Sequence, residues 1–175
     1  AGHGIRKVKR LLGMVDLYAH DRPESDTAER FKHLRTYLAR HLPDDAPAAL
    51  CVTSSIPGEG KTFCAVNTAI AFAAAGARTL LIDADLRKTR LTRIFDASGR
   101  MGLGNILYEM RRPDGLCSQT RVPSLWVLPA GTVDEIFAID PDRLVALLSG
   151  LKSGFDRIVI DLPPLAATSD PLLVA

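Results

Sequence analysis

The segment at residues 55–62, SIPGEGKT, constrains the fold of this chain more than any other. A short apolar run at residues 49–52 precedes it, and an alanine-rich pattern of helical type at residues 63–75 follows it. A phosphate-binding loop requires this order of strand, loop and helix. Gly58 and Gly60 have no Cβ atom, so their backbone can take positive φ and bring its N–H groups close to a phosphate. The segment therefore predicts a site for phosphate groups.

Two side chains at the end of this segment suit the chemistry of a nucleoside triphosphate. Lys61 can reach the β- and γ-phosphates, and the Thr62 hydroxyl is a hard oxygen ligand of the kind that Mg²⁺ prefers. The helix that follows adds its unpaired N–H groups and the positive end of its dipole. Ser55 stands where the usual GxxxxGK[ST] pattern has its first glycine, and a small residue should still fit there. A glycine-rich turn that matches by chance is the alternative, and the flanking strand and helix argue against it.

Acidic residues follow two other predicted strands. Asp83 and Asp85 come after the apolar run at residues 79–82, and Asp161 comes after the run at residues 157–160. In open α/β sheets, ligands bind beyond the carboxyl ends of the strands. Phosphoryl transfer needs phosphates held in place, their charge neutralised, and a carboxylate that orients or deprotonates the nucleophile. Each aspartate alone could instead cap a helix or face water, but three beside a phosphate loop favour a transfer site.

The remaining pattern alternates strands with helices, which is typical of a mainly parallel α/β sheet with helices on both faces. We expect a further strand at residues 125–128 and a helix at residues 141–151, opened by proline. Shorter helices are expected at residues 89–95 and 103–109. The apolar stripe of a longer helix at residues 27–42 consists of Phe31, Leu34, Leu38 and Leu42. Asp26 followed by Glu29 is typical of a capping box at its start.

Length and composition allow one domain with a sizeable core, at 175 residues and 47% hydrophobic content. The net charge of +2 neither favours nor opposes nucleic acid as a partner. Cys51 and Cys64 fall on a predicted strand and helix, so we expect buried free thiols. No apolar run is long enough to span a bilayer. The apolar run at residues 172–175 stops abruptly, so we expect a longer gene product.

The first ten residues carry a small basic cluster, which could lie against an anionic membrane surface or be a solvated terminus. The cluster consists of Arg6, Lys7, Lys9 and Arg10. A short helix could follow at residues 11–18. We expect residues 1–24 to form an N-terminal extension or linker, and residues 25–175 to form the domain.

Three motifs together resemble those of the bacterial tyrosine kinases (BY-kinases) of capsule and exopolysaccharide synthesis, which are P-loop proteins related to the MinD/ParA ATPases. Residues 55–62 are similar to the family's Walker A motif. Residues 80–87, three apolar residues and then DxDxR, are similar to its Walker A′ motif. Residues 158–164, three apolar residues and then DxxP, are similar to its Walker B motif. The resemblance covers about residues 25–175 and implies a P-loop NTPase fold that lacks its last strands here.

The resemblance also implies binding of ATP or ADP with Mg²⁺, and autophosphorylation on tyrosine. By this resemblance the catalytic residues are Lys61, Asp83, Asp85 and Asp161, with Asp85 accepting the tyrosine proton. The metal and its waters are held by Thr62, Asp83 and Asp161. The residues that the resemblance assigns to the nucleotide are Ser55, Pro57, Gly58, Glu59, Gly60, Lys61, Thr62, Phe63 and Arg87.

Members of that family form rings through a helix with the pattern ExxRxxR. The corresponding residues here are Glu29, Lys32 and Arg35, so lysine replaces the first arginine and cannot make its bidentate contacts. The alternative is that Glu29 caps its own helix and the cations are solvated. The resemblance further implies the cytoplasmic tail of a membrane chain-length regulator as activator, and a tyrosine phosphatase. It implies a cytoplasmic domain at the inner face of the plasma membrane, with no nucleic acid as partner.

Two other functions remain open. A MinD/ParA-like ATPase switch would hydrolyse ATP without phosphorylating protein, but that branch carries a second lysine early in its loop. Ile56 stands in that place and Pro57 replaces a glycine, which favours the kinase. A nucleotide-binding regulatory subunit without catalysis is the third possibility. The tyrosine-rich tail of the kinases is missing, and Tyr37 and Tyr108 fall in helical patterns, where we expect packing residues rather than phosphate acceptors.

Overall fold

The computed structural model describes residues 17–43, 46–133 and 141–167, and its described strands form one five-stranded sheet. The order of the strands is β1-β5-β2-β4-β3, and all neighbours are parallel except β3 and β4. Their bounds are β1 Ala48–Val52, β2 Thr79–Asp83, β3 Ser118–Gln119, β4 Leu125–Leu128 and β5 Arg157–Asp161. The predicted α/β class with a mainly parallel sheet is confirmed. The two-residue strand β3 was not predicted.

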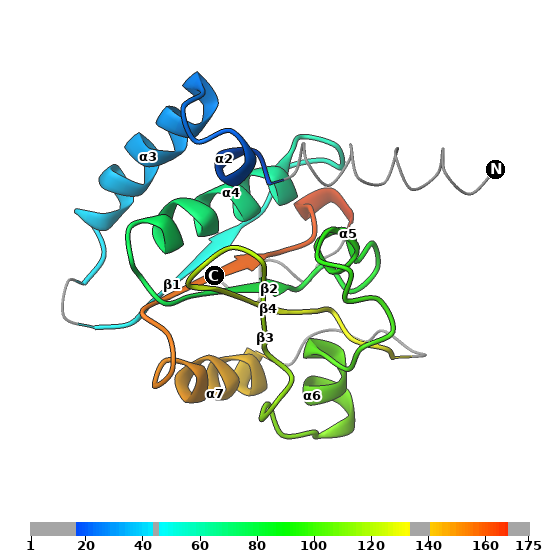
Figure 1. Ribbon diagram of the computed structural model, residues 1–175. Coiled ribbons are helices and arrows are strands. Elements are labelled where there is room, and N and C mark those ends of the chain that lie inside the picture. Colours follow the sequence, from blue (N-terminus) through cyan, green and yellow to red (C-terminus); the bar gives the residue numbers. More distant parts are fainter. Residues whose placement is uncertain (1–16, 44–45, 134–140, 168–175) are drawn as a thin grey trace.

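Helices cover both faces of this sheet, as Figure 1 shows. One face carries α2, α3 and α4, and the other carries α6 and α7. The bounds are α2 Tyr18–Asp21, α3 Asp26–Ala39, α4 Lys61–Ala74, α5 Arg90–Ile94, α6 Leu103–Glu109 and α7 Pro141–Leu151, with a 3₁₀ turn at Leu165–Ala167. Every helix predicted between residues 27 and 151 is therefore present, with ends that differ by up to three residues.

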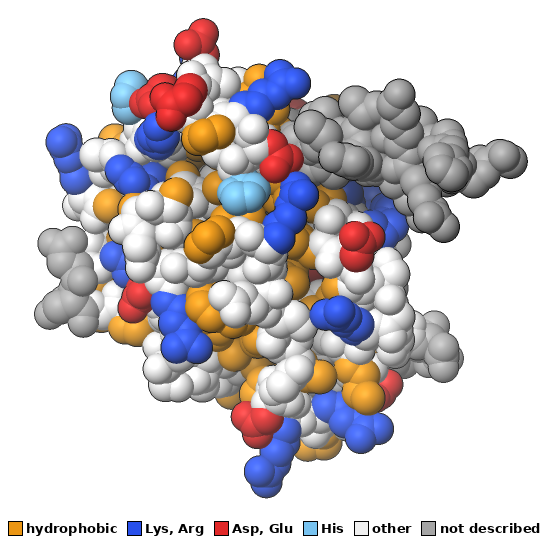
Figure 2. Space-filling view, viewed as in Figure 1, with side chains coloured by type: hydrophobic (Ala, Val, Ile, Leu, Met, Phe, Trp, Pro, Cys, Tyr) orange, Lys and Arg blue, Asp and Glu red, His pale blue; other side chains and the backbone are white. Residues whose placement is uncertain are grey.

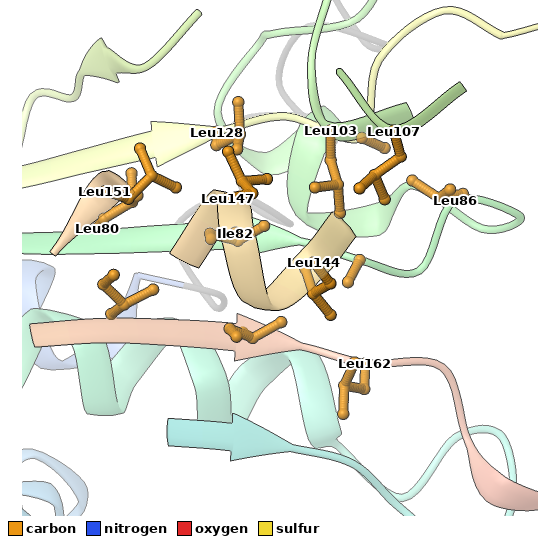
Figure 3. Close-up of a cluster of buried hydrophobic side chains, with 14 of the residues drawn as sticks. Leu80, Ile82, Leu86, Leu103, Leu107, Leu128, Leu144, Leu147, Leu151 and Leu162 are labelled. Carbon is orange, nitrogen blue, oxygen red and sulfur yellow. The ribbon is translucent and has the colours of Figure 1, made fainter. Parts of the chain in front are cut away.

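Side chains that alternate along β2 supply both cores. Leu80 and Ile82 pack with three leucines of α7, which are Leu144, Leu147 and Leu151 (Figure 3). On the opposite face, Leu81 of β2 packs against the alanine-rich α4. Because burying one leucine stabilises a fold by roughly 1.5–3 kcal/mol, these two layers fix the position of the strand between them.

Several local predictions were wrong. The N-cap of α3 is Ser25, whose hydroxyl accepts from the Ala28 N–H at 3.2 Å, rather than Asp26 in a capping box. Cys51 and Cys64 are exposed free thiols, because β1 is an edge strand of the described sheet and Cys64 lies on the outer side of α4. Tyr37 is 63% exposed and stacks on the neighbouring ring of His41, so it is not a core residue.

The surface has no strong separation of charge on the face seen in Figure 2, where cationic, anionic and hydrophobic side chains are interspersed. Within residues 17–43, 46–133 and 141–167, no helix combines the length and the apolar character that a membrane span requires. Outside the described residues lie the basic cluster at residues 6–10, all but the last two residues of the helix predicted at residues 11–18, and the apolar run at residues 172–175. Helix α2 begins at Tyr18, where that predicted helix was expected to end.

Candidate active site

The order of the strands brings the three sequence motifs to one edge of the sheet. β5 lies between β1 and β2. In the parallel register, Asp161 is the partner of Val52 on one side and of Asp83 on the other. The loop that follows β1 therefore begins beside Asp161, and the carboxyl ends of β2 and β5 lie next to each other. A site that needs the loop and both aspartates follows from this arrangement.

The loop at residues 55–62 has the backbone that the sequence predicts. Gly58 and Gly60 have φ of 94° and 91°, a conformation that side chains with a Cβ atom rarely adopt. Gly60 is the N-cap of α4, so the helix points its unpaired N–H groups toward the loop. Glu59 links the end of the loop to its start, since its Oε2 accepts from the N–H groups of Ser55 at 2.9 Å and Ile56 at 3.1 Å.

Lys61 lies between two of the carboxylates. Its Nζ is 3.0 Å from Asp85 Oδ2 and 3.2 Å from Asp161 Oδ1. All three side chains are largely buried, with exposed fractions of 12%, 6% and 1%. The hydroxyl of Thr62 also forms a hydrogen bond with Asp161. The first turn of α4 therefore supplies a cation and a hydroxyl to the carboxylates that follow β2 and β5.

Asp83 has different partners. Its Oδ2 accepts from the backbone N–H of Thr92 at 2.8 Å and from the hydroxyl of the same residue at 2.6 Å. The pKa of Asp83 is raised to about 6, mainly by burial and to a lesser degree by the nearby Asp161 and Asp85, against the effect of the Thr92 hydrogen bonds. Burial also raises the pKa of Asp161, but there Lys61 opposes the rise. The site thus holds two carboxylates with the Lys61 cation beside them, Asp85 and Asp161, and one without it, Asp83.

The donors fit a Mg²⁺ ion that is shared with a nucleotide. Asp83 Oδ1 and Asp161 Oδ2 are buried oxygens without a hydrogen-bond partner, and buried polar atoms of this kind need a partner to be stable. With the Thr62 hydroxyl they offer the hard oxygens that Mg²⁺ prefers. Over the described part of the chain, no group of three or more His, Cys, Asp or Glu is arranged to hold a metal alone. Phosphate oxygens and water would complete the shell, as is usual for Mg²⁺.

Two of the residues predicted to contact the nucleotide have other surroundings. The ring of Phe63 packs edge-to-face on Phe31 of α3, with 5.7 Å between the centroids, so its side chain serves helix packing. Arg87 is exposed on the loop that follows Asp85. Sequence reasoning missed Thr92, because it lies outside the three motifs and only the folded chain brings it to Asp83.

Comparison with known proteins identifies relatives that are named as tyrosine-protein kinases. No protein-family model matches the chain. CapB of Staphylococcus aureus, named as a tyrosine-protein kinase, is 32% identical over 173 residues, which cover 95% of this chain and 74% of CapB. The tyrosine-protein kinase CpsD of Streptococcus agalactiae is 32% identical over 161 residues, covering 88% of this chain and 68% of CpsD. The chain spans only 22% of EpsB of Ralstonia solanacearum, which is 31% identical.

Solved structures agree with these sequences. The chimeric protein CapA2B2 superimposes with a TM-score of 0.78 at 29% identity, covering 91% of this chain and 71% of that one. The MinD protein of Pyrococcus horikoshii, solved with Mg-ADP, gives a TM-score of 0.61 at 26% identity, covering 73% of this chain and 54% of that one. CapB and CpsD are each 32% identical to this chain, which spans more than two thirds of either protein, and the solved structures share its P-loop NTPase fold. The chain belongs to the family of bacterial tyrosine-protein kinases.

Proposed function

We propose that this chain is the ATP-binding domain of a tyrosine autokinase, which transfers the γ-phosphate of ATP to tyrosine and regulates the synthesis or export of a capsule or exopolysaccharide. The observation that carries this proposal is the position of Lys61 between Asp85 and Asp161, beside the phosphate loop. The names of CapB and CpsD as tyrosine-protein kinases, and of ExoP as a succinoglycan biosynthesis transport protein, support the same reaction and pathway class.

The residues of the site take separate roles in this proposal. The loop amides and Lys61 hold the phosphates, and Thr62, Asp83 and Asp161 hold the metal and its waters. Mg²⁺, when bound, neutralises charge on the phosphate oxygens. Asp85 accepts the proton of the attacking tyrosine, since its carboxylate lies just beyond the carboxyl end of β2, where ligands of parallel sheets bind.

The domain boundary and the assembly are part of the proposal. Residues 1–24 are an extension and residues 25–175 the kinase domain, placed in the cytoplasm at the inner face of the membrane. Its activator is the cytoplasmic tail of a membrane chain-length regulator, and a tyrosine phosphatase removes the phosphate from tyrosine by hydrolysis. The name of the CapA2B2 chimera and the greater length of EpsB support a further membrane-linked part.

A ring of subunits would use the exposed side of α3, through Glu29, Lys32 and Arg35. In the single chain, Glu29 Oε1 and Lys32 Nζ already form an ion pair at 2.6 Å, and Lys32 also donates to the carbonyl of Pro23. Arg35 donates to the Thr36 hydroxyl at 3.3 Å. These exposed contacts are weak, so they can be exchanged for contacts with a second subunit.

Incubation of the full-length protein with Mg-ATP and its activator tests the kinase. We expect phosphotyrosine on the protein, detected by antibody and located by mass spectrometry. Lys61→Met should abolish the signal, whereas Lys152→Met, an exposed lysine after α7, should leave it unchanged. No phosphotyrosine with the activator present, or a signal that survives Lys61→Met, would contradict the proposal.

The likeness to MinD supports one alternative, an ATPase switch that acts without protein phosphorylation. Release of inorganic phosphate in the absence of phosphotyrosine would select it. Assembly that depends on nucleotide, with neither phosphate release nor phosphotyrosine, would instead select a regulatory subunit without catalysis.

A further inference from the structure

Thr92 connects the ends of two strands through a single buried hydroxyl. It lies in α5 with 4% of its surface exposed. Its backbone N–H and its hydroxyl both reach Asp83 Oδ2, at 2.8 and 2.6 Å. The same hydroxyl oxygen is 2.8 Å from the backbone N–H of Ala130, in the segment that follows β4. Thr92 therefore links the carboxyl end of β2 to that of β4.

The direction of these hydrogen bonds is fixed by the number of protons. A threonine hydroxyl has one proton, and the N–H of Ala130 can only donate. The hydroxyl oxygen must accept from Ala130, so its own proton is free to point to Asp83. Asp83 Oδ2 then receives two donors, while Oδ1 receives none and is buried. Thr92 thus determines which oxygen of Asp83 remains available to the site.

The backbone before α5 is arranged to bring Thr92 to this place. The chain turns back directly after β2, because Lys88 and Thr89 donate their N–H groups to the carboxylate and the carbonyl of Asp85. Thr89, the N-cap of α5, has φ of 37°, a conformation that costs a residue other than glycine roughly 1–3 kcal/mol. Contacts with the surrounding residues must hold this strained turn in place. Three of these contacts are the hydrogen bonds of Thr92 to Asp83 and Ala130.

We propose that Thr92 is a positioning residue for Mg-nucleotide binding, which orients Asp83 so that its Oδ1 faces the metal and its waters. This inference rests on the proposed function, since it assigns a role within the same site. Thr92 itself touches neither nucleotide nor metal in this proposal. Partners of this kind, one shell beyond a metal-binding group, typically affect metal affinity by about 10- to 100-fold.

The test is the binding of a fluorescent ADP analogue to the 175-residue chain, measured with Mg²⁺ and with EDTA. The quantity of interest is the ratio of the two dissociation constants. Thr92→Val keeps the shape and the backbone N–H but removes the hydroxyl, so we expect the Mg²⁺-dependent gain in affinity to fall about tenfold. Binding in EDTA should remain unchanged. Thr92→Ser restores the hydroxyl and should return the ratio to within about twofold of the wild type.

Thr79→Val is the matched control, because Thr79 is a second buried threonine, at the opposite end of β2 from Asp83, and its hydroxyl donates to the carbonyl of Ala77. It should lower stability without changing the Mg²⁺ ratio. If Thr92→Val does not fold, the pair Thr92→Ser and Thr92→Ala makes the same comparison.

An unchanged ratio in the variants that lack the hydroxyl, or an equal loss in Thr92→Ser, would overturn the role of Thr92 and leave the proposed function intact. A wild-type chain that binds no nucleotide, with or without Mg²⁺, would instead overturn the proposed function and this inference with it.

Discussion

Asp83 and Asp161 occupy equivalent positions but have different surroundings. They are register partners at the ends of β2 and β5, and both side chains are fully buried. The partners of Asp161 come from the first turn of α4, namely the ammonium of Lys61 and the hydroxyl of Thr62. Within the described residues, both hydrogen-bond donors to Asp83 belong to Thr92 in α5, and both are neutral.

The difference shows that burial alone does not determine the charge of a strand-end carboxylate. The pKa of Asp83 is raised to about 6 because burial outweighs its neutral hydrogen bonds. The pKa of Asp161 is raised by burial too, but a nearby cation opposes that rise. Asp161 contacts the first turn of α4, the helix that follows the glycine-rich loop, whereas Asp83 is hydrogen-bonded to α5.

The largest effect on stability should come from removing the Lys61 cation, which distinguishes the surroundings of Asp161 from those of Asp83. Lys61→Met leaves Asp85 and Asp161 buried without their positive partner, and loss of one member of a buried pair typically costs about 4 kcal/mol. We expect this loss in urea denaturation at pH 8 without nucleotide. The loss should be smaller at pH 5, since a carboxylate whose pKa has risen further can be protonated there. Lys152→Met is the control, and an equal loss at both pH values would contradict the comparison.

The next effect concerns the ionisation of Asp83. Its pKa is raised from 3.8 to about 6, so the stability it contributes is complete below about pH 4 and is lost as the pH rises through about 6. Asp83→Asn has no charge to bury, and its amide oxygen can still accept from Thr92. Relative to the wild type, it should gain up to about 3 kcal/mol of unfolding free energy between pH 4 and pH 8, measured in EDTA.

Asp161→Asn serves as the comparison in that experiment. Its gain over the same pH range should have the same sign but a smaller size, because Lys61 and Thr62 partly offset the rise that burial causes in the pKa of Asp161. A gain as large as that of Asp83→Asn would show that the cation does not distinguish the two carboxylates.

A smaller effect is expected from the loop that presents Lys61. Glu59→Ala removes the acceptor for the N–H groups of Ser55 and Ile56, so the loop must be ordered when the nucleotide binds. The loss of these two exposed hydrogen bonds corresponds to about 1 kcal/mol in all, or about fivefold in affinity for a fluorescent ADP analogue. Glu59→Gln keeps an acceptor and should lose less. Equal affinity for the wild type and Glu59→Ala would assign the loop conformation to its glycines alone.

The smallest effect should come from the exposed ion pair of α3. The Glu29–Lys32 distance of 2.6 Å is shorter than either contact of Lys61, but both side chains are about half exposed. Lys32 lowers the pKa of Glu29, yet water and salt screen such pairs. Lys32→Ala should therefore give a urea denaturation curve that coincides with that of the wild type. A loss comparable to that of Lys61→Met would mean that distance, rather than burial, sets the strength of these pairs.

Much of this arrangement could be predicted from the sequence, because the signals were local. The apolar runs at residues 79–82 and 157–160 fixed two strands, and their aspartates had to lie at the carboxyl edge. The glycines of the phosphate loop take the positive φ that was expected of them.

The predictions that were wrong or missing concern residues whose surroundings depend on the whole fold. The apolar run of β1 resembles that of β5, but β1 lies at the edge of the described sheet and leaves Cys51 exposed. Ser25 and Asp26 are both good N-caps, and only the geometry of the entering chain selects Ser25. Thr92 could not be recognised, since its role depends on the return of the chain after β2.

The insertion of β5 between β1 and β2 has a consequence for the way the chain acquires its structure. Among the described strands, β1 forms hydrogen bonds with β5 only, and Lys61 finds Asp161 a hundred residues further along the chain. During synthesis, the phosphate loop is complete long before the strand that will support it has been made. Closing so long a loop is slow, because its entropy is lost before the stabilising contacts between β1 and β5 can form. The ability to bind nucleotide should therefore appear late in folding and in a single step, when β5 enters the sheet.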